Sequence, residues 1–275
     1  MGISLELKTT PDISLEADCV NPSVTDLEPD AISRLKLWQG RVQVELGEFF
    51  SVSEIKTERQ DELHVTGDLS RVKYLGKGTS SGKMTIWGSC GMHTCEGMKG
   101  GEVEIYGDAA NWCFCAMQGG QAKIHGSAGA FLAAAFPGDA RGMKGGVIWV
   151  RGDVGARAVE RMRRGLLVVG GTIGELAAAE MIAGTVVSLG RLSERAGASM
   201  KRGAILAMGS CDALLTGFEW SCTYNPTFVG MLGRELYKNG LIDDPSPFTN
   251  AERGFSRWCG DMVSMGKGEI LIREK

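Results

Sequence analysis

The sequence predicts an all-β protein, a right-handed parallel β-helix in which single strands build a solenoid of about 19 residues per coil. Three regularities between residues 82 and 209 carry this prediction. A glycine opens each of seven units, a second glycine follows six residues later, and a methionine precedes six of the opening glycines by three residues. The opening glycines are spaced by 19, 19, 26, 19, 19 and 19 residues: Gly82, Gly101, Gly120, Gly146, Gly165, Gly184 and Gly203.

Each unit places a short apolar run between its two glycines. A strand that has copies of itself on both sides is satisfied by parallel pairing, and the flanking glycines allow sharp turns. The period is too short for helical hairpin repeats, and the leucine-rich pattern is missing. With adjacent coils about 4.8 Å apart, about eight coils would form a rod of roughly 38 Å. Strict alternation with polar residues fades in the later units.

Residues 1–60 are expected to form an N-terminal cap of strand and loop. The run Ile3–Leu7 alternates as a strand does, and prolines then interrupt the chain. Pro29–Leu35 can form one or two helical turns, because Asp30 can cap them and Ile32 shares a face with Leu35. Alternation over residues 42–46 predicts another strand.

Residues 61–216 are expected to form the repeat domain. The run Glu62–Asp68 is a degenerate first coil, since its Gly67 precedes Gly88 by 21 residues. Seven additional residues between Gly120 and Gly146 fall within 133–142 and predict a protruding loop. Insertions of this kind lie on one face of a repeat protein, often the binding face.

Residues 217–275 are expected to cap the C-terminal end with a helix and a final strand. Apolar residues from Phe228 to Tyr237 have near-helical spacing, and Asn239-Gly240 predicts the helix end. We expect this amphipathic helix to cover the open end of the solenoid, because exposed strand edges invite association.

Composition excludes several classes of function. A net charge of −3 with 23% charged residues argues against a nucleic-acid binder or a membrane-surface protein. The chain has no apolar run long enough to span a bilayer and no secretory pattern at its start, so we expect a cytoplasmic protein. In that compartment the eight cysteines should be free thiols.

The sequence contains no recognisable catalytic motif, so we expect no catalytic residues in this chain. The three histidines occupy different positions of the repeat, and no phosphate-binding loop or serine-nucleophile motif occurs. The methionine column is interpreted as core packing, since no charged or histidine-like column accompanies it. Cys95, Cys113 and Cys115 could share one corner of adjacent coils. Packing is the preferred interpretation over a metal site, because no Cys-x-x-Cys occurs.

Basic residues follow the methionine column in several units. Stacked units would align them into a cationic stripe along one edge, which is either a solvated turn or a contact surface for a polyanion. The candidate polyanion contacts are Arg163, Arg164, Lys201 and Arg202. We expect this chain to bind no metal and no cofactor of its own.

Several motifs along the chain match those of a known family. They include Gly-Met-Lys-Gly-Gly at 97–101 and 142–146, Pro-Gly-Asp-Ala-Arg at 137–141, and segments 38–40, 46–52, 67–76, 160–165, 259–261 and 266–271. On these residues, nearly the whole chain resembles the gamma (C) subunit of formylmethanofuran dehydrogenase and its counterpart in the bacterial formyltransferase/hydrolase complex. It is more distantly similar to the glycine-repeat β-helix domain of glutamate synthase. Thr79, where the family has methionine, and Trp112–Cys115, where it has a glycine-rich turn, depart from the pattern.

The resemblance implies a non-catalytic scaffold in a complex of one-carbon metabolism that uses methanofuran or methylofuran. Its implied partners are an amidohydrolase-type A subunit, a B subunit and a formyltransferase-type D subunit in a hetero-oligomer, without nucleic acid or membrane. The furan cofactor implied for the bacterial complex has a glutamate tail, which the cationic stripe could hold. Two alternatives stay open: a glutamate-synthase-like β-helix domain of an amidotransferase, and a free-standing binding solenoid.

Overall fold

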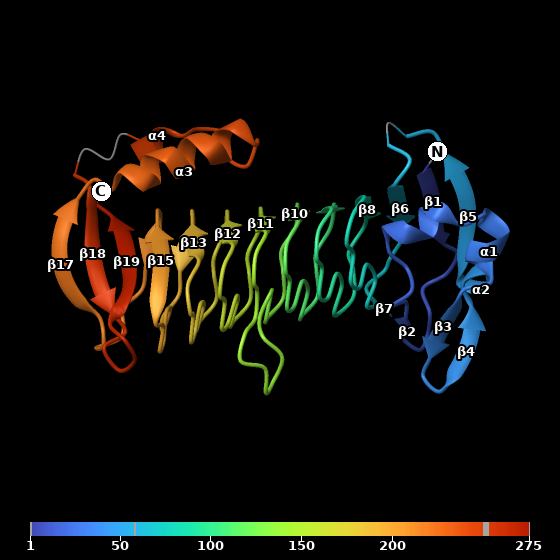
Figure 1. Ribbon diagram of the computed structural model, residues 1–275, viewed down its shortest axis with the longest axis horizontal. Coiled ribbons are helices and arrows are strands. Elements are labelled where there is room, and N and C mark those ends of the chain that lie inside the picture. The colour runs from blue at the N-terminus through green and yellow to red at the C-terminus, as the bar shows by residue number, and fades with distance from the viewer. Residues whose placement is uncertain (1, 58, 250–252, 275) are drawn as a thin grey trace.

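A long mixed sheet of 13 strands runs along the molecule (Figure 1). The computed structural model describes residues 2–57, 59–249 and 253–274. The strands of this sheet are β1 (Gly2–Leu7), β5 (Phe50–Ile55), β6 (Glu62–Thr66), β8 (Lys83–Trp87), β9 (Glu102–Ile105), β10 (Gln121–Ile124), β11 (Val147–Val150), β12 (Leu166–Val169), β13 (Thr185–Ser188), β15 (Arg202–Ala207), β17 (Glu219–Tyr224), β18 (Phe255–Gly260) and β19 (Lys267–Arg273). Their order is β17-β18-β19-β15-β13-β12-β11-β10-β9-β8-β6-β1-β5.

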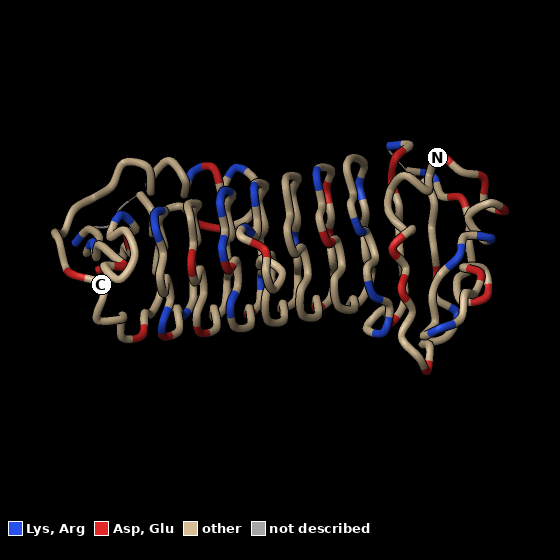
Figure 2. Tube along the Cα trace, turned by 60° about the horizontal axis from the view of Figure 1, so that its bottom comes forward, with Lys and Arg blue, Asp and Glu red and all other residues tan. Residues whose placement is uncertain are grey.

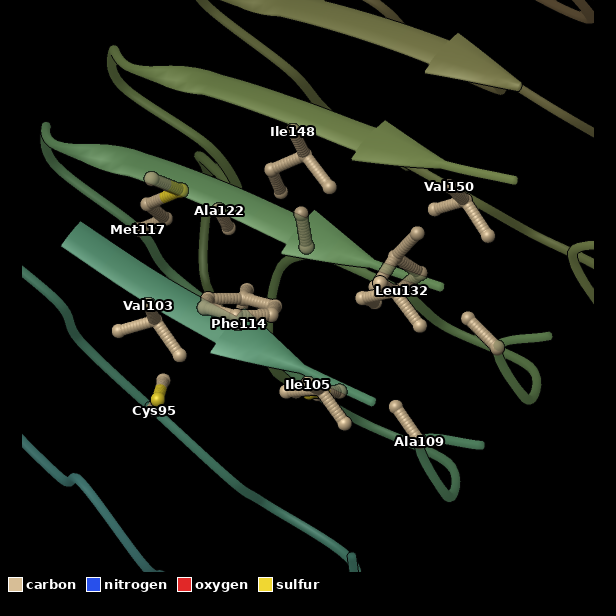
Figure 3. Close-up of a cluster of buried hydrophobic side chains, with 14 of the residues drawn as sticks. Cys95, Val103, Ile105, Ala109, Phe114, Met117, Ala122, Leu132, Ile148 and Val150 are labelled. Atoms are coloured by element: carbon tan, nitrogen blue, oxygen red, sulfur yellow. The ribbon is translucent and has the colours of Figure 1, made fainter. Parts of the chain in front are cut away.

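Each repeat unit contributes one parallel strand to this sheet, in the register that the glycine spacing predicts. Ala122 of β10 lies opposite Val103 of β9 and Ile148 of β11. Side chains alternate between the two faces, and those of the inner face pack against the returning part of each unit. Figure 3 shows this core, where Val103, Ile105 and Phe114 lie close together. The core therefore lies between the sheet and the return segments.

The return segments are turns instead of continuous strands. In these segments one residue of each unit forms an isolated parallel β-bridge with the equivalent residue of the next unit. The bridged residues are, in order, Leu69, Cys90, Ala109, Ala128, Val154, Ile173 and Leu192. Several non-glycine residues here have positive φ angles, including Trp112 at 64° and Phe131 at 60°. The chain therefore bends sharply at the same place in successive units, and side chains there stack in a row.

Residues before the repeat form a second, smaller sheet beside two short helices. Its order is β4-β3-β2-β7. The predicted helical turns at Pro29–Leu35 and the predicted strand over 42–46 are both present, although Leu46 already begins the next helix. The elements are β2 (Leu15–Glu16), a 3-10 helix at Pro22–Asp26, α1 (Pro29–Ser33), β3 (Lys36–Gln39), β4 (Val42–Glu45), α2 (Leu46–Phe49) and β7 (Val72–Lys73).

Beyond β15, the strand of the last repeat unit, the sheet continues with β19, which pairs parallel to β15, and then with the antiparallel strands β18 and β17. Here α3 (Thr227–Lys238) and α4 (Ser246–Thr249) precede β18, and β14 (Arg191–Leu192) pairs with β16 (Ser210–Cys211). Val229 and Leu236 of α3 belong to the same buried cluster as Val187 and Leu206 of the sheet. In the part of the chain that the structure describes, no helix is long and apolar enough to cross a membrane.

The predicted fold class is wrong. Within the described residues the units do not close into a single-stranded parallel β-helix, because only one side of each unit forms an extended strand. The main sheet is mixed, since β5 pairs antiparallel with β1, and β18 pairs antiparallel with both β17 and β19. Four α-helices also accompany the sheets in the described ranges, so the chain is not all-β.

The predicted role of the C-terminal helix is wrong as well. The helix itself forms where the spacing predicts it, but it lies along the outer face of the sheet instead of covering the end (Figure 1). Its apolar side chains need apolar partners, and the later strands provide them at Val168, Val187 and Leu206. This explains why polar alternation fades in the later units. Antiparallel strands occupy the end of the sheet.

Candidate functional site

The six column methionines fix the position of the basic stripe. Each is fully buried, which confirms the core-packing interpretation: Met98, Met117, Met143, Met162, Met181 and Met200. Backbone amides after these methionines donate to carbonyls of the preceding unit. Arg163 N donates to Met143 O at 2.8 Å, and Lys201 N donates to Met181 O at 2.7 Å. Residues that follow the methionines are thereby held in a row at the turn.

The four predicted polyanion contacts line one surface pocket. Arg163, Arg164, Lys201 and Arg202 surround a depression of about 390 Å³ together with Ile182, Ala183 and Met265. The first two basic residues come from one unit and the last two come from two units later. The intervening unit has Ile182-Ala183 at these positions, so a short apolar floor separates the two cationic pairs. Figure 2 shows lysine and arginine recurring on neighbouring units in this half of the repeat.

The cations of this pocket, which we call the basic pocket, have no internal counter-charge. Among the described residues, no carboxylate lies within 4.0 Å of any of these four side chains. Other arginines nearby are paired: Arg161 Nε lies 3.1 Å from Glu180 Oε2, and Arg191 Nη2 lies 2.9 Å from Asp212 Oδ2. Four unpaired positive charges around one depression create a local field that attracts anions.

The cysteines predicted to share a corner are buried in the core. The neighbouring thiol of Cys113 lowers the pKa of Cys90, although burial opposes this shift. Burial raises the pKa values of Cys95 and Cys113 well above the usual range for thiols. Cys115 donates instead to the carbonyl of Phe131 at 3.3 Å. Across residues 2–57, 59–249 and 253–274, no group of three or more metal-ligating side chains is arranged to hold a metal ion.

Each histidine lies beside a glutamate. His64 Nε2 is 3.0 Å from Glu62, His93 Nδ1 is 3.0 Å from Glu96, and His125 Nε2 is 2.9 Å from Glu104. Burial alone would raise the pKa of Glu104, but hydrogen bonds from His125 and Tyr106 lower it.

Aromatic side chains form two rows that were not predicted from the sequence. On the outer face Trp87 stacks on Tyr106 and Tyr106 stacks on His125, with ring centroids 4.2 and 4.4 Å apart. Trp112 stacks on Phe131 at 4.2 Å on the turn side. A 19-residue spacing separates the members of each pair, so a search for aromatic residues at the repeat period could have found both rows.

The insertion at 133–142 is held against its neighbours at defined points. Arg161 Nη1 donates to the carbonyl of Asp139 at 2.8 Å, and the ring of Phe136 lies 6.0 Å from those of His93 and Trp112. The loop protrudes from the repeat, as the spacing predicts (Figure 1).

Part of the chain is similar in sequence to known proteins, although no family model matches it. One relative is the C subunit of molybdenum-containing formylmethanofuran dehydrogenase 1 from Methanothermobacter marburgensis, which is 42% identical over 94 residues. The matched residues make up 34% of this chain and 23% of the relative. The corresponding protein from Methanosarcina barkeri is 39% identical over 85 residues. Those residues make up 30% of this chain and 28% of the relative. The matches thus span about a quarter of each relative's length.

The chain resembles the gamma (C) subunit of formylmethanofuran dehydrogenase. The resemblance that the sequence predicted is confirmed by these relatives and by one solved structure. A chain of the formyltransferase/hydrolase complex (FhcABCD) from Methylorubrum extorquens, in complex with methylofuran, superposes with a TM-score of 0.89 and 28% identity. That superposition covers 99% of this chain and 100% of the other. The similarity to the dehydrogenase is therefore local in sequence, and the similarity to the bacterial complex runs from end to end.

Proposed function

We propose that this chain is a non-catalytic scaffold subunit of a hetero-oligomeric C1-transfer complex that acts on formylmethanofuran or formyl-methylofuran. The observation that carries the proposal is the end-to-end superposition on a chain of the formyltransferase/hydrolase complex. The dehydrogenase subunits match over only about a quarter of their length, so the transferase/hydrolase form of the complex is favoured.

A scaffold needs surfaces that partners can cover, and the C-terminal end of the sheet has one. The side chain of Trp220 on the edge strand β17 is 59% exposed, and Val263 in the β18–β19 turn is 82% exposed. Met262 and Met265 of that turn are exposed as well. Large exposed apolar groups of this kind are typical of interaction surfaces. We assign this end and the insertion at 133–142 to contacts with the amidohydrolase-type and formyltransferase-type subunits.

Co-purification from the native source tests the scaffold role. A tagged chain should retain amidohydrolase-type and formyltransferase-type subunits, identified by mass spectrometry. Retention of glutaminase or glutamate synthase polypeptides would support the amidotransferase alternative instead. A chain that is recovered alone would contradict both and leave a free-standing binding protein.

The basic pocket is proposed to contact the polyglutamate tail of a furan cofactor that the complex uses. Successive carboxylates of such a tail could face the pair Arg163–Arg164 and then the pair Lys201–Arg202, with the floor at Ile182-Ala183 between them. A flexible tail held by four charges keeps the cofactor near the complex while its reactive end remains free to move.

Charge reversal tests this contact. The variant with Arg163, Arg164, Lys201 and Arg202 all replaced by glutamate should assemble with its partners but retain less furan cofactor. A matched control reverses Arg41 and Lys56, which are exposed and lie outside the pocket. Cofactor retention equal to the control in an intact complex would show that the pocket does not hold the tail.

A further inference from the structure

A turn of residues 261–266 joins β18 to β19 at the lower end of these two strands (Figure 1). We call it the C-terminal turn. Its first residue, Asp261, is buried, whereas the side chains of residues 262–265 are exposed. A buried base and an exposed tip are the two properties that a docking element needs, because the base fixes the geometry and the tip makes the contact.

The carboxylate of Asp261 holds this turn in place. Asp261 is 4% exposed, its Oδ2 atom accepts from Ser199 N at 3.0 Å, and its Oδ1 atom accepts from Val263 N at 3.1 Å. Ser199 directly precedes Met200, the last methionine of the column. Hydrogen bonds from backbone amides to a carboxylate are charge-assisted and stronger than neutral ones. The turn is thereby attached to the end of the repeat.

Three further backbone amides of the turn are paired. Met262 N donates to Gly217 O at 2.9 Å. Ser264 N and Gly266 N both donate to Asp261 O, at 3.0 and 3.1 Å. Gly217 also leaves room for the Asp261 side chain, since a Cβ atom at Gly217 would overlap with Oδ1. A segment whose backbone is already fixed loses little conformational freedom when a partner binds, so the C-terminal turn is preorganised.

The side chains that this turn exposes are large and apolar. Val263 is 82% exposed, Met262 is 50% exposed and Met265 is 46% exposed. Single exposed apolar residues are common on protein surfaces, but three on one fixed turn form a local apolar projection. Apolar side chains contribute most to binding where they enter a pocket of the partner from which water is excluded. The turn therefore fits an apolar socket better than a flat surface.

The charges beside the turn differ between its two sides. Lys267 directly follows the turn and lies opposite Arg202 of β15. Within the described residues, no carboxylate lies within 4.0 Å of the Lys267 side chain. Glu219 of β17 lies on the other side of β18, opposite Cys259. A surface that covers the turn is complementary when it presents a carboxylate toward Lys267 and a basic group toward Glu219.

We propose that the C-terminal turn is an anchor that enters an apolar socket on a partner protein subunit, with Val263 at its tip. A carboxylate on one rim of the socket pairs with Lys267, and a basic group on the opposite rim faces Glu219. Lys267 does not line the basic pocket, so this contact leaves the four cations of that pocket to the cofactor tail. The inference rests on the proposed function, because the socket belongs to a subunit of the same complex.

Quantitative co-purification of the tagged full chain from the native source tests the anchor. Val263→Asp should lower the ratio of retained partner subunit to tagged chain by about tenfold or more, because it places a charge in an apolar socket. Ile13→Asp is the matched control, since Ile13 is an apolar residue that is 58% exposed in the N-terminal part of the molecule. It should leave the ratio unchanged. Circular dichroism establishes that each variant is folded.

The charged rim is tested separately by salt. Lys267→Glu should lower the same ratio by about threefold or more at low salt, and the difference from the unaltered chain should shrink as salt rises. The effect of Val263→Asp should persist at high salt, because burial of an apolar side chain is not screened. Lys56→Glu reverses an exposed charge near the N-terminal edge of the sheet and is the control. A Lys267→Glu effect that is absent at low salt would contradict the charged rim.

Partner retention in Val263→Asp equal to that in Ile13→Asp would overturn the anchor. Light scattering measures whether the chain associates with itself. Loss of self-association in Val263→Asp with every partner subunit retained would assign the turn to a second copy of this chain, and would overturn the proposal as well.

Failure of the proposed function gives a different result. If the unaltered chain retains glutamate synthase polypeptides and Val263→Asp loses them, the proposed complex is wrong, whereas the anchor and its socket are supported. An unaltered chain that is recovered alone would contradict both.

Discussion

The tip of Met181 lies against Gly203 of the following repeat unit. A Cβ atom on Gly203 would stand 2.7 Å from the terminal methyl carbon of Met181, too close for any real side chain. The same contact joins Met98 to Gly120 and Met117 to Gly146. The methionine column and the opening glycines therefore recur together because each methionine needs the space that the glycine of the next unit leaves free.

Truncation of Met181 should destabilise the protein strongly. Met181→Ala leaves a cavity beside Gly203 and should lower the free energy of unfolding by about 2–5 kcal/mol, whereas Met181→Leu should cost less than about 1.5 kcal/mol. Urea denaturation measures both. Met231→Ala, at a side chain that is 63% exposed, is the control and should change stability by no more than about 0.5 kcal/mol. Similar losses for Met181→Ala and Met231→Ala would contradict the packing role.

The stack of Trp112 on Phe131 should contribute a measurable coupling energy. Their ring planes are nearly parallel, with an angle of 4° between them. A double-mutant cycle with Trp112→Ala and Phe131→Ala should give a coupling of about 0.5–1.5 kcal/mol. A cycle between Trp112→Ala and the distant Trp220→Ala should give none within error. Equal coupling in both cycles would mean that the stack does not act as a unit.

The contact between His125 and Glu104 predicts a loss of stability in acid. Because hydrogen bonds lower the pKa of Glu104 below its ordinary value of 4.5 in the folded protein, its stabilisation is present above that pH and is lost as pH falls through the folded-state pKa. Glu104→Gln should therefore lose less stability than the unaltered protein between about pH 5 and pH 3. Thermal denaturation across that range measures the difference, and parallel curves would contradict it. His125→Gln should move the loss to higher pH.

Thiol labelling should separate the buried cysteines from the accessible ones. Cys222 and Cys259 are partly exposed, whereas Cys95 and Cys113 are fully buried and have raised pKa values because burial disfavours the thiolate. Alkylation of the native protein at about pH 8 should modify Cys222 and Cys259 first, as peptide mass spectrometry can show. Rapid native labelling at Cys95 would mean that the return segments open readily.

Because α3 packs on the outer face of the sheet, we expect the stability of the protein to depend on the side chain of Leu236. Leu236 is buried against the outer face, so Leu236→Ala should cost about 2–4 kcal/mol. Its neighbour Tyr237 is exposed, and Tyr237→Ala should cost about 0.5 kcal/mol or less. Equal costs at the two positions would indicate that the helix does not pack by this face.

Much of the local structure was predictable from the sequence because it depends on short-range rules. The strands of the repeat, the C-terminal helix with its end at Asn239-Gly240, and the burial of the methionine column follow from glycine spacing and apolar periodicity. The four cations of the basic pocket were also predictable, since parallel units in register align equivalent residues. The polyanion contact itself, the absence of catalytic residues and the division at residues 60 and 216 stay predictions.

The sequence by itself determined the repeat unit, its strand and the register between units, because those depend on residues at a fixed spacing. Only the tertiary structure decided that the units form a mixed sheet with turn-like return segments. Left-handed residues such as Trp112 turn the return segment away from a continuous strand, and antiparallel pairing at β1–β5 and β17–β18–β19 makes the sheet mixed. The tertiary structure also decided that α3 lies on the outer face of the sheet. Val187 and Leu206 on that face need an apolar cover, and no local sequence pattern specifies which segment provides it.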